Sequence, residues 1–494
     1  MAKSKKEFRP KARAPRGFPD RFGAGLKAER EMLARISDVY ESYGFDPLET
    51  SAFEYTDALG KFLPDVDRPN EGVFSLQDDD GQWMSLRYDL TAPLARYVAE
   101  HYDALPKPFR RYAMGPVWRN EKPGPGRYRQ FTQVDADTVG APAPHADAEM
   151  CVLFAEVIEA AGIPPGDFVI RVSNRKIVDG LFERLGLAAE EDAGRRLNVM
   201  RSMDKFDRLG EEGVRLLLGP GRKDDSGDFT EGARLGNREI DAVIAFLAST
   251  VSGDDAATLG RLGAIVGDSP AGAAGIAELE AIIRQAPEER RSSIVVDCSI
   301  IRGLEYYTGP VFEADILWRP DEEPVRLGSV GGGGRYDGLV KRFKGVEVPA
   351  VGISVGVSRL LAALEFRTDA FEPLTRPVVV LALENDRMPE YQALAAELRA
   401  AGLRAEVYLG GANFAKQLKY ADKRNAPVAV IQGEDERAKG VVTIKDLVLG
   451  AQLSREIEDN AEWREAQRAQ VEVARCDLVA ETMNVLDRHK SRRG

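Results

Sequence analysis

The chain has 494 residues, which predicts two to four domains at the usual size of about 100 to 200 residues each and excludes a small scaffold. Hydrophobic residues make up 44% and charged residues 30%, with 47 Gly and 27 Pro, a balance that excludes a largely disordered chain. The net charge of −12 gives no general attraction for nucleic acid or anionic membranes, and the apolar runs are strand-sized, so we expect only local nucleic-acid contacts and no membrane partner.

The N-terminal segment, residues 1–15, is rich in Lys and Arg and has no apolar stretch. It predicts a basic, disordered arm that is either merely solvated or lies on phosphate groups. The three cysteines and three histidines of the chain are widely spaced and form neither a zinc motif nor a disulfide framework. We therefore expect a reducing, cytoplasmic environment.

The first half of the chain predicts a helix, then antiparallel sheet, then a second helix. Apolar residues at helical spacing predict a helix over Leu26–Tyr43, which ends before Gly44. Short apolar runs up to Val139 predict strands, with a hairpin turn at Asp78–Gly81, and His145–Ala161 predicts another helix. Residues 183–290 predict an inserted, mostly helical module in which 219–228 is a loop.

Strands return after this insertion, at Ser293–Ser299, Val311–Leu317 and Ala350–Val355, and a helix is predicted over Val357–Phe366. The polar segment 365–376 is the best candidate for a linker. Beyond it, strands and helices alternate, which predicts a separate α/β domain. The tail, residues 455–487, predicts a helix with Trp463, Val471, Leu478 and Leu486 as its apolar stripe.

Arginines that lie beside aromatic residues and carboxylates are the main sequence indication of a binding site. Strand alternation from residue 127 to 137 places one line of side chains on a single face, namely Arg129, Phe131, Gln133, Asp135 and Asp137. Burying these polar side chains in a hydrophobic core would be unfavourable, so the pattern indicates that they face a ligand. Planar guanidinium groups suit phosphate or carboxylate, so converging arginines predict a polyphosphate substrate.

These segments resemble the histidyl-tRNA synthetase family. The segments around Arg119 and Phe131 resemble motif 2 of class II aminoacyl-tRNA synthetases, and 350–360 resembles their motif 3. Residues 301–307 and 332–338 are similar to the two histidyl signature segments, and 410–423 to the family's anticodon-binding domain.

The resemblance implies an α+β fold with a class II antiparallel-sheet catalytic core. The expected parts are a basic arm (1–15), a first core segment (16–182), a helical insertion (183–290), a second core segment (291–368), a C-terminal α/β anticodon-binding domain (376–453) and a helical tail (454–494). The implied activity is that of a homodimeric histidine-tRNA ligase, which joins L-histidine to tRNA(His) with ATP and Mg²⁺ and without an organic cofactor. No metal-ligand set is predicted.

The resemblance also implies roles for single residues. For ATP, Arg119 would hold the α-phosphate, Glu121 and Phe131 the adenine, and Arg359 the γ-phosphate. For histidine, Asp89, Thr91 and Gln133 would hold the α-amino group, while Asp137 and Tyr307 would face the imidazole. Arg302 would sit at the α-phosphate opposite Arg119 as a fixed cationic catalyst and would also bind histidine, and Tyr306 is either a packing neighbour or a further histidine contact.

For tRNA, the resemblance implies contacts by Lys122, Lys416, Gln417 and Lys423, although the lysines could equally be solvated. The turn that follows Lys122, Pro-Gly-Pro-Gly, lacks long polar side chains. It predicts weak dependence on the extra 5′ guanylate of histidine tRNAs, unless backbone amides or nearby arginines recognise that base.

The sequence departs from the family pattern at three positions, and it leaves alternatives open for the glycine run and for the function. Ser51 replaces a proline of motif 1 at the dimer seam, and Asp89 and Asp137 replace glutamates. The Gly331–Gly334 run is either a flexible loop or a place where backbone approaches the bound amino acid. Besides the enzyme, the sequence allows a catalytically silent regulatory or histidine-sensing subunit, or a tRNA-binding scaffold.

Overall fold

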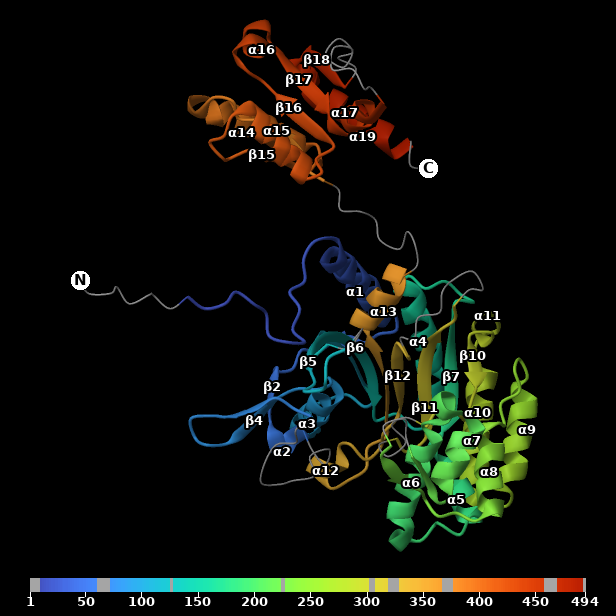
Figure 1. Cartoon of the computed structure of the whole chain (residues 1–494). Coiled ribbons are helices and arrows are strands. Elements are labelled where there is room, and N and C mark those ends of the chain that lie inside the picture. Colours follow the sequence, from blue (N-terminus) through green and yellow to red (C-terminus); the bar gives the residue numbers. More distant parts are fainter. Residues whose placement is uncertain are drawn as a thin grey trace. The chain divides into compact units, whose positions relative to one another are not determined.

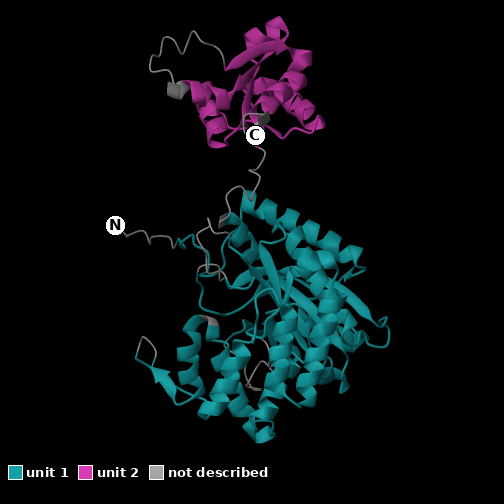
Figure 2. Ribbon diagram, turned by 90° about the vertical axis from the view of Figure 1, so that its right-hand side faces the viewer, with its two compact units in different colours: residues 1–372 teal, residues 373–494 magenta. Residues whose placement is uncertain are grey.

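The chain divides into two compact units, residues 1–372 and 373–494, each with its own hydrophobic core (Figure 2). The computed structural model describes residues 9–59, 72–124, 128–223, 227–301, 307–318, 328–366, 376–456 and 469–491. Within these ranges, no helix is long and apolar enough to cross a membrane.

The first unit is built on a large, mostly antiparallel sheet, with eight strands among the described residues (Figure 1). In order across the sheet these are β1 (Asp46–Pro47), β5 (Phe109–Trp118), β6 (Gln130–Val139), β13 (Ala350–Gly356), β12 (Gly331–Arg335), β11 (Pro310–Ile316), β7 (Phe168–Asn174) and β10 (Ile294–Val296). Only the outermost pairs at each end run parallel. The predicted antiparallel core is confirmed.

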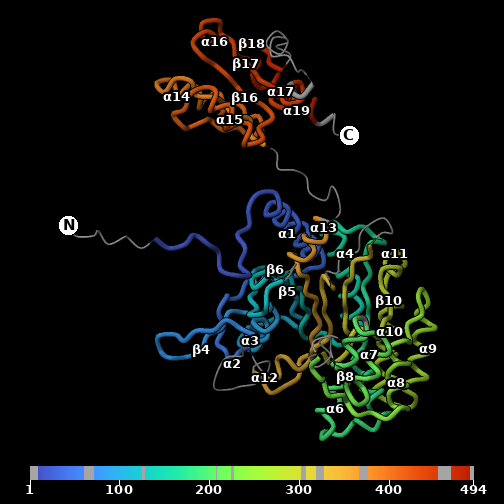
Figure 3. Tube along the Cα trace, viewed as in Figure 1, coloured from blue at the N-terminus to red at the C-terminus, as the bar shows by residue number. Residues whose placement is uncertain are grey.

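Side-chain alternation gives this sheet one apolar and one polar face. Val134 and Ala136 of β6, and Ile353 of β13, join the core beneath α1 (Ala24–Ser42), α4 (His145–Ala160), α10 (Pro270–Gln285) and α13 (Val357–Phe366). Figure 3 shows α1 beside α13, although the two helices are far apart in the sequence. The intervening residues Gln133 and Ser354 lie on the other face, which bears the cavity described below.

Smaller elements complete the first unit. A three-stranded sheet is formed by β2 (Phe53–Tyr55), β4 (Trp83–Leu86) and β3 (Ser75–Gln77), with the predicted turn at Gly81. The other helices are α2 (Thr56–Leu59), α3 (Thr91–His101), α5 (Arg175–Arg184), α6 (Ala193–Met203), α7 (Phe206–Leu218), α8 (Asn237–Leu247), α9 (Asp255–Val266), α11 (Glu288–Arg291) and α12 (Lys341–Lys344). Where a loop was expected at 219–228, β8 (Gly221–Lys223) pairs with β9 (Phe229–Glu231) as a ribbon.

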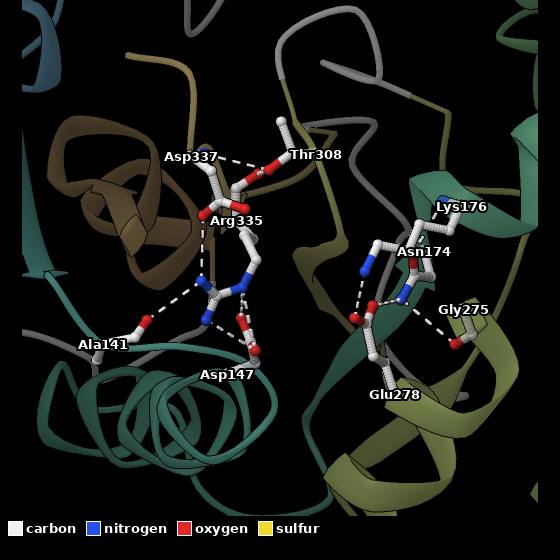
Figure 4. Close-up of polar contacts among 9 residues, drawn as sticks. All are labelled: Ala141, Asp147, Asn174, Lys176, Gly275, Glu278, Thr308, Arg335 and Asp337. Carbon is white, nitrogen blue, oxygen red and sulfur yellow. Dashed lines mark hydrogen bonds and ion pairs between the residues drawn. The ribbon is translucent and has the colours of Figure 1, made fainter. Parts of the chain in front are cut away.

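Two buried polar networks fasten the sheet to its helices (Figure 4). Arg335 of β12 pairs with Asp147 of α4 at 2.9 Å and also contacts Asp337 at 3.1 Å. Asn174, at the end of β7, donates to Glu278 of α10 at 2.8 Å, and Lys176 pairs with the same carboxylate. Helix α10, which lies within the inserted segment, therefore packs against the large sheet and is an integral part of the first unit.

The second unit is a five-stranded sheet, again counted over described residues, with helices along it. Its strands, in order across the sheet, are β15 (Ala405–Val407), β14 (Val378–Val380), β16 (Val428–Ile431), β17 (Val441–Asp446) and β18 (Gln470–Ala474). Its helices are α14 (Met388–Ala400), α15 (Phe414–Lys423), α16 (Glu434–Lys439), α17 (Leu447–Glu456) and α19 (Leu478–Ser491).

The tail differs from its sequence-based expectation. The predicted helical stripe is interrupted, because Val471 lies in β18, which pairs with β17. Leu478 and Val485 of α19 are buried in the core of the second unit. A strand and a helix of the tail thus complete the C-terminal sheet and its core, and Trp463 lies outside the described residues.

Candidate active site

A cavity of about 530 Å³ opens on the polar face of the large sheet. Six residues predicted for the site line it together, namely Arg119, Glu121, Phe131, Gln133, Tyr307 and Arg359. They come from the β5–β6 hairpin, from the segment before β11 and from the first turn of α13. Arg119 and Arg359, which are 240 residues apart in the sequence, therefore line the same cavity.

Two guanidinium groups face this cavity. The guanidinium of Arg119 lies 5.1 Å from the centre of the Phe131 ring, and its Nε donates to the carbonyl of Tyr88 at 3.2 Å. Arg359 donates to the carbonyl of Ser329. Both arginines line the cavity, so two guanidinium groups, which suit phosphate or carboxylate oxygens, lie in one site.

The Gly331–Gly334 run is the central strand β12 and not a flexible loop. A Cβ atom on Gly333 would lie 2.2 Å from the carbonyl oxygen of Gly352 in β13, and one on Gly334 would lie 2.6 Å from that of Pro310. Gly331, Gly332 and Gly333 also line the cavity. Glycine is required here by close strand packing, and it lets backbone form one wall of the site.

Of the residues predicted to hold an α-amino group, Gln133 lines the cavity, whereas Asp89 and Thr91 do not. Asp89 accepts hydrogen bonds from the backbone of Thr91 and Ala92, at 3.2 and 2.9 Å, and so orders the start of α3. The hydroxyl of Thr91 lies 3.4 Å from the carboxylate of Asp135, and Gln133 Nε2 donates to Ser354 Oγ at 2.7 Å. These contacts join the start of α3 with β6 and β13. We call this group of polar side chains the floor of the site; Gln133 and Ser354 are its members that line the cavity.

A buried ion pair lies at the far end of this floor. Asp137 and Arg111, directly opposite each other in β6 and β5, are 2% and 1% exposed and approach to 2.7 Å. Asp137 also accepts the hydroxyl of Tyr336, and Arg111 donates to the carbonyl of Leu90 at 2.9 Å. The sequence analysis does not single out Arg111. Its place shortly before Arg119 is the signal that could have done so, because it puts Arg111 on the same β5–β6 hairpin as Asp137.

Burial sets the electrostatics of the floor. It raises the pKa of Asp135 to about 7, with Arg111 opposing the shift and Asp137 adding to it. Burial likewise raises the pKa of Asp89 and of Asp137, and it raises the pKa of the Tyr307 phenol beside these carboxylates. Each of these three carboxylates also interacts with the buried Arg111, which opposes the effect of burial on its pKa.

Other predicted residues are placed as follows. Arg302 and Tyr306 lie outside the described residues, as does the tip of the β5–β6 turn at 125–127. Lys122, which precedes that tip, is exposed. Within the second unit, Lys416 and Lys423 are exposed on α15, whereas Gln417 is 1% exposed and bonds both the amide and the carbonyl of Ala382, at 2.9 and 2.7 Å.

No group of three or more His, Cys, Asp or Glu side chains in the described part of the chain could hold a metal ion. The cavity lies on an antiparallel sheet and is lined by two arginines, an aromatic ring and glycine backbone. This fold, with an arginine after β5 and another at the start of α13, is that of a class II aminoacyl-tRNA synthetase.

Comparisons with known proteins give the family. The model of the histidyl-tRNA synthetase family matches residues 17–360, and the anticodon binding domain matches residues 377–467. The chain is 56% identical to the histidine-tRNA ligase of Rhizobium leguminosarum bv. trifolii (strain WSM2304), covering 98% of this chain and 97% of the relative. It is 54% identical to that of Jannaschia sp. (strain CCS1), covering 99% and 100%.

A solved structure agrees with these relatives. The crystal structure of histidyl-tRNA synthetase from Nostoc sp. PCC 7120 superposes with a TM-score of 0.71 at 30% identity, covering 97% of this chain and 100% of that chain. The chain belongs to the histidyl-tRNA synthetase family.

Proposed function

We propose that this protein is a cytoplasmic histidine-tRNA ligase. It activates L-histidine with ATP to histidyl-adenylate and pyrophosphate, and then transfers histidine to the 3′ end of tRNA(His). The observation that carries this proposal is that one cavity is lined by two arginines, by the Phe131 ring and by Gln133, which extends from the same strand as the buried carboxylates Asp135 and Asp137. The similarity to histidine-tRNA ligases over nearly the whole chain favours the enzyme over a silent regulatory subunit or a scaffold.

The activation step needs positioning and charge neutralisation more than covalent catalysis. A carboxylate oxygen of histidine attacks the α-phosphorus of ATP, and the bond to the leaving pyrophosphate breaks. Arg119 would bind the α-phosphate, where charge develops, and Arg359 the γ-phosphate of the Mg²⁺-bound nucleotide. Phe131, beneath the Arg119 guanidinium, would stack on adenine, and Glu121 would accept from the adenine amino group. Arg302 would add a second cation at the α-phosphate.

The floor would select the amino acid. Asp89, Thr91 and Gln133 would hold the α-ammonium group, and Tyr307 and Asp137 would face the imidazole. Asp137 already contacts Arg111 and Tyr336, but each carboxylate oxygen has two acceptor positions, so this pair leaves capacity for a ligand. Arg111 and Tyr336 would then hold Asp137 still while histidine binds.

The lysines of the hairpin and of α15 would contact tRNA. Lys122 stands at the rim of the catalytic hairpin, and Lys416 and Lys423 form an exposed basic face of α15. Gln417 would act indirectly, because its buried amide clamps the backbone of Ala382 and of Ala412, which lies just before α15. Its role would be to shape the surface from which the lysines project.

We also propose a homodimer, supported by an apolar face on the small sheet. Phe53, Tyr55 and Leu76 are 39%, 50% and 43% exposed. Tyr55 and Leu76 both lie opposite Met84 of the central strand β4, so their side chains share one face. Ser51, where the family has proline, accepts the backbone N–H of Phe53 at 3.2 Å and so orders the start of this sheet.

Amino-acid-dependent exchange of pyrophosphate into ATP tests the proposed activity. We expect exchange with histidine and a loss of at least about 100-fold in efficiency with each of the other nineteen amino acids. The physical reason is that a ligand without imidazole nitrogens cannot make the hydrogen bonds proposed for Tyr307 and Asp137. Comparable exchange with any other amino acid would exclude the assignment.

Separating the two units tests the role proposed for the second one. A fragment that ends at residue 366 is expected to keep histidine-dependent exchange within about tenfold of the full chain, because every residue that lines the cavity lies in the first unit. The same fragment should lose most aminoacylation of tRNA(His), measured at limiting tRNA. Full-rate aminoacylation by the fragment would show that α15 and its lysines are not needed.

A further inference from the structure

We propose that the N-terminal segment 9–16 binds phosphates of the acceptor arm of tRNA(His), and that Gly17 holds this segment at the turn between β5 and β6. The proposal rests on the proposed function, because it takes tRNA as a substrate whose 3′ end enters the cavity. It assigns a partner to a segment that precedes the match to the histidyl-tRNA synthetase family, which begins at residue 17.

Segment 9–16 concentrates positive charge at the surface. Half of its residues are cationic, none is acidic, and the cationic side chains are all exposed. The cationic residues are Arg9, Lys11, Arg13 and Arg16. The whole chain carries a net charge of −12, so this local excess is opposite in sign to that of the protein. Such a segment attracts a polyanion locally where the protein as a whole does not.

The backbone of this segment suits contact with successive phosphates. Pro10 and Pro15 fix their own φ angles and favour extended backbone in the residues before them. Residues 9–15 are all described, and they form neither helix nor strand. At about 3.1 Å per residue, an extended run from Arg9 to Arg16 spans roughly 20 Å. The charges are therefore spread along a line, as the phosphates of a nucleic-acid strand are.

Gly17 joins the segment to the catalytic hairpin. Its carbonyl accepts the backbone N–H of Arg129 at 2.8 Å, and Figure 1 shows the N-terminal segment, in blue, beside β5 before it reaches α1. A Cβ atom on Gly17 would lie 2.8 Å from Cγ of Arg129 and 2.9 Å from Cγ of Pro123, and its φ is +86°, so the position requires glycine. Phe18 packs on Phe74, with ring centroids 5.6 Å apart. Gly17 thus lies between the two sides of the β5–β6 turn.

This junction lies beside the cavity. Pro123 is two residues after Glu121, and Arg129 follows Tyr128; both Glu121 and Tyr128 line the cavity. The Nε of Arg129 donates to the carbonyl of Glu121 at 3.0 Å, which ties the two sides of the turn together. Because the 3′ end of tRNA must enter this cavity to accept histidine, the acceptor arm lies close to the point from which segment 9–16 extends.

The main test is a four-alanine variant of the full chain, which combines Arg9→Ala, Lys11→Ala, Arg13→Ala and Arg16→Ala. Its Kd for tRNA(His) is expected to rise about tenfold at about 0.1 M salt, because four phosphate contacts are lost. The slope of log Kd against log salt concentration should fall by about 3, since each lost contact removes about 0.7 to 0.9. Histidine-dependent pyrophosphate exchange needs no tRNA, and it should stay within about twofold of wild type.

A hairpin RNA that carries only the acceptor arm of tRNA(His) locates the contact. The four-alanine variant should bind this RNA about tenfold more weakly than wild type does, the same factor as for the whole tRNA. A loss with the whole tRNA but not with the hairpin RNA would overturn the assignment to the acceptor arm. So would a raised KM for ATP in exchange together with normal tRNA binding, because the cations would then contact the nucleotide.

Gly17→Ala separates the position of the segment from its charge. This variant keeps every cation, but the added Cβ atom displaces the segment from the turn, so Kd for tRNA(His) should rise about threefold or more. Adding Gly17→Ala to the four-alanine variant should raise Kd no further, since no charge is left to displace. A wild-type Kd in Gly17→Ala, or independent effects in the combined variant, would overturn the role of Gly17.

Two controls distinguish phosphate contacts from a general effect of charge. Arg9→Lys, Arg13→Lys and Arg16→Lys together should keep Kd within about twofold of wild type, because a phosphate accepts either cation. Alanine at four exposed arginines of helices α8 to α11 should also keep Kd within about twofold, and an equal loss there would overturn the proposal. These four are Arg238, Arg261, Arg284 and Arg291.

The two proposals fail in different ways. Absence of histidine-dependent exchange in the wild-type chain would count against the proposed function. Normal wild-type exchange, with unaltered tRNA binding by the four-alanine variant, would count against the role of segment 9–16 alone.

Discussion

Replacing Arg119 by alanine is expected to slow histidine-dependent pyrophosphate exchange about 100-fold or more, equivalent to about 3 kcal/mol of transition-state stabilisation. The guanidinium is held by the Phe131 ring and the Tyr88 carbonyl, so its orientation exists before ATP binds. Charge that develops on the α-phosphate in the transition state then meets a fixed cation. We expect the loss mainly in kcat, measured with saturating ATP and histidine.

Three further variants are compared with Arg119→Ala. Arg119→Lys keeps the charge but loses the planar fork, and should recover only part of the rate. Arg261→Ala removes an exposed arginine of α9 and should leave exchange unchanged. Arg302→Ala, at a residue outside the described ranges, is expected to behave like Arg119→Ala. An Arg119→Ala variant with near-normal kcat would show that this arginine only packs on Phe131.

The sequence predicts most of the fold because its local signals and its core requirements agree. Apolar spacing and Gly44 define α1, and the alternation in β6 separates Val134 and Ala136 from the polar line of Gln133 and Asp135. The glycine run Gly331–Gly334 is an exception, because its strand is not apparent from the sequence pattern. Glycines carry no apolar pattern, so the strand β12 is apparent only when its neighbours Gly352 and Pro310 are in place.

The site is partly predictable for the same reason. Cavity residues that belong to motifs can be found from their neighbours in the sequence, as Arg119 and Arg359 are. Arg111 cannot, because its importance arises from strand register, which places Arg111 opposite Asp137. Gln417 shows the converse, since its sequence motif suggests a ligand contact while its amide is buried against Ala382.

Replacing Arg111 by leucine is expected to lower the free energy of unfolding by about 3 to 5 kcal/mol at pH 8, the usual cost of removing one partner from a buried ion pair. Arg111 is the positive group that lowers the pKa of Asp135 and of Asp137, and after Arg119 it also lowers the pKa of Asp89. Without Arg111, Asp135 and Asp137 lose their counter-charge and Asp89 loses part of its own. The measurement is urea denaturation of wild type and variant at pH 8 and at pH 5.5.

The direction in which pH changes the free energy of unfolding follows from the coupling between protonation and folding. The folded-state pKa values of these carboxyls already lie above their unfolded values, and losing Arg111 raises them further. A carboxyl of this kind favours the folded state while protonated, and stability is lost as pH rises through the folded pKa. The deficit of Arg111→Leu should therefore be largest above pH 7 and shrink toward pH 5.5.

A second substitution and a control complete the prediction for Arg111. Adding Asp137→Asn to Arg111→Leu removes one of the unpaired charges and should restore part of the stability at pH 8. Arg171 also contacts two carboxylates, Asp297 and Asp315, each at 3.1 Å, but its side chain is 33% exposed. Because solvent screens such a group, Arg171→Leu should cost no more than about 1 kcal/mol. Equal losses in the two leucine variants, or a deficit for Arg111→Leu that grows on acidification, would mean that the Arg111 charge does not stabilise the floor of the site.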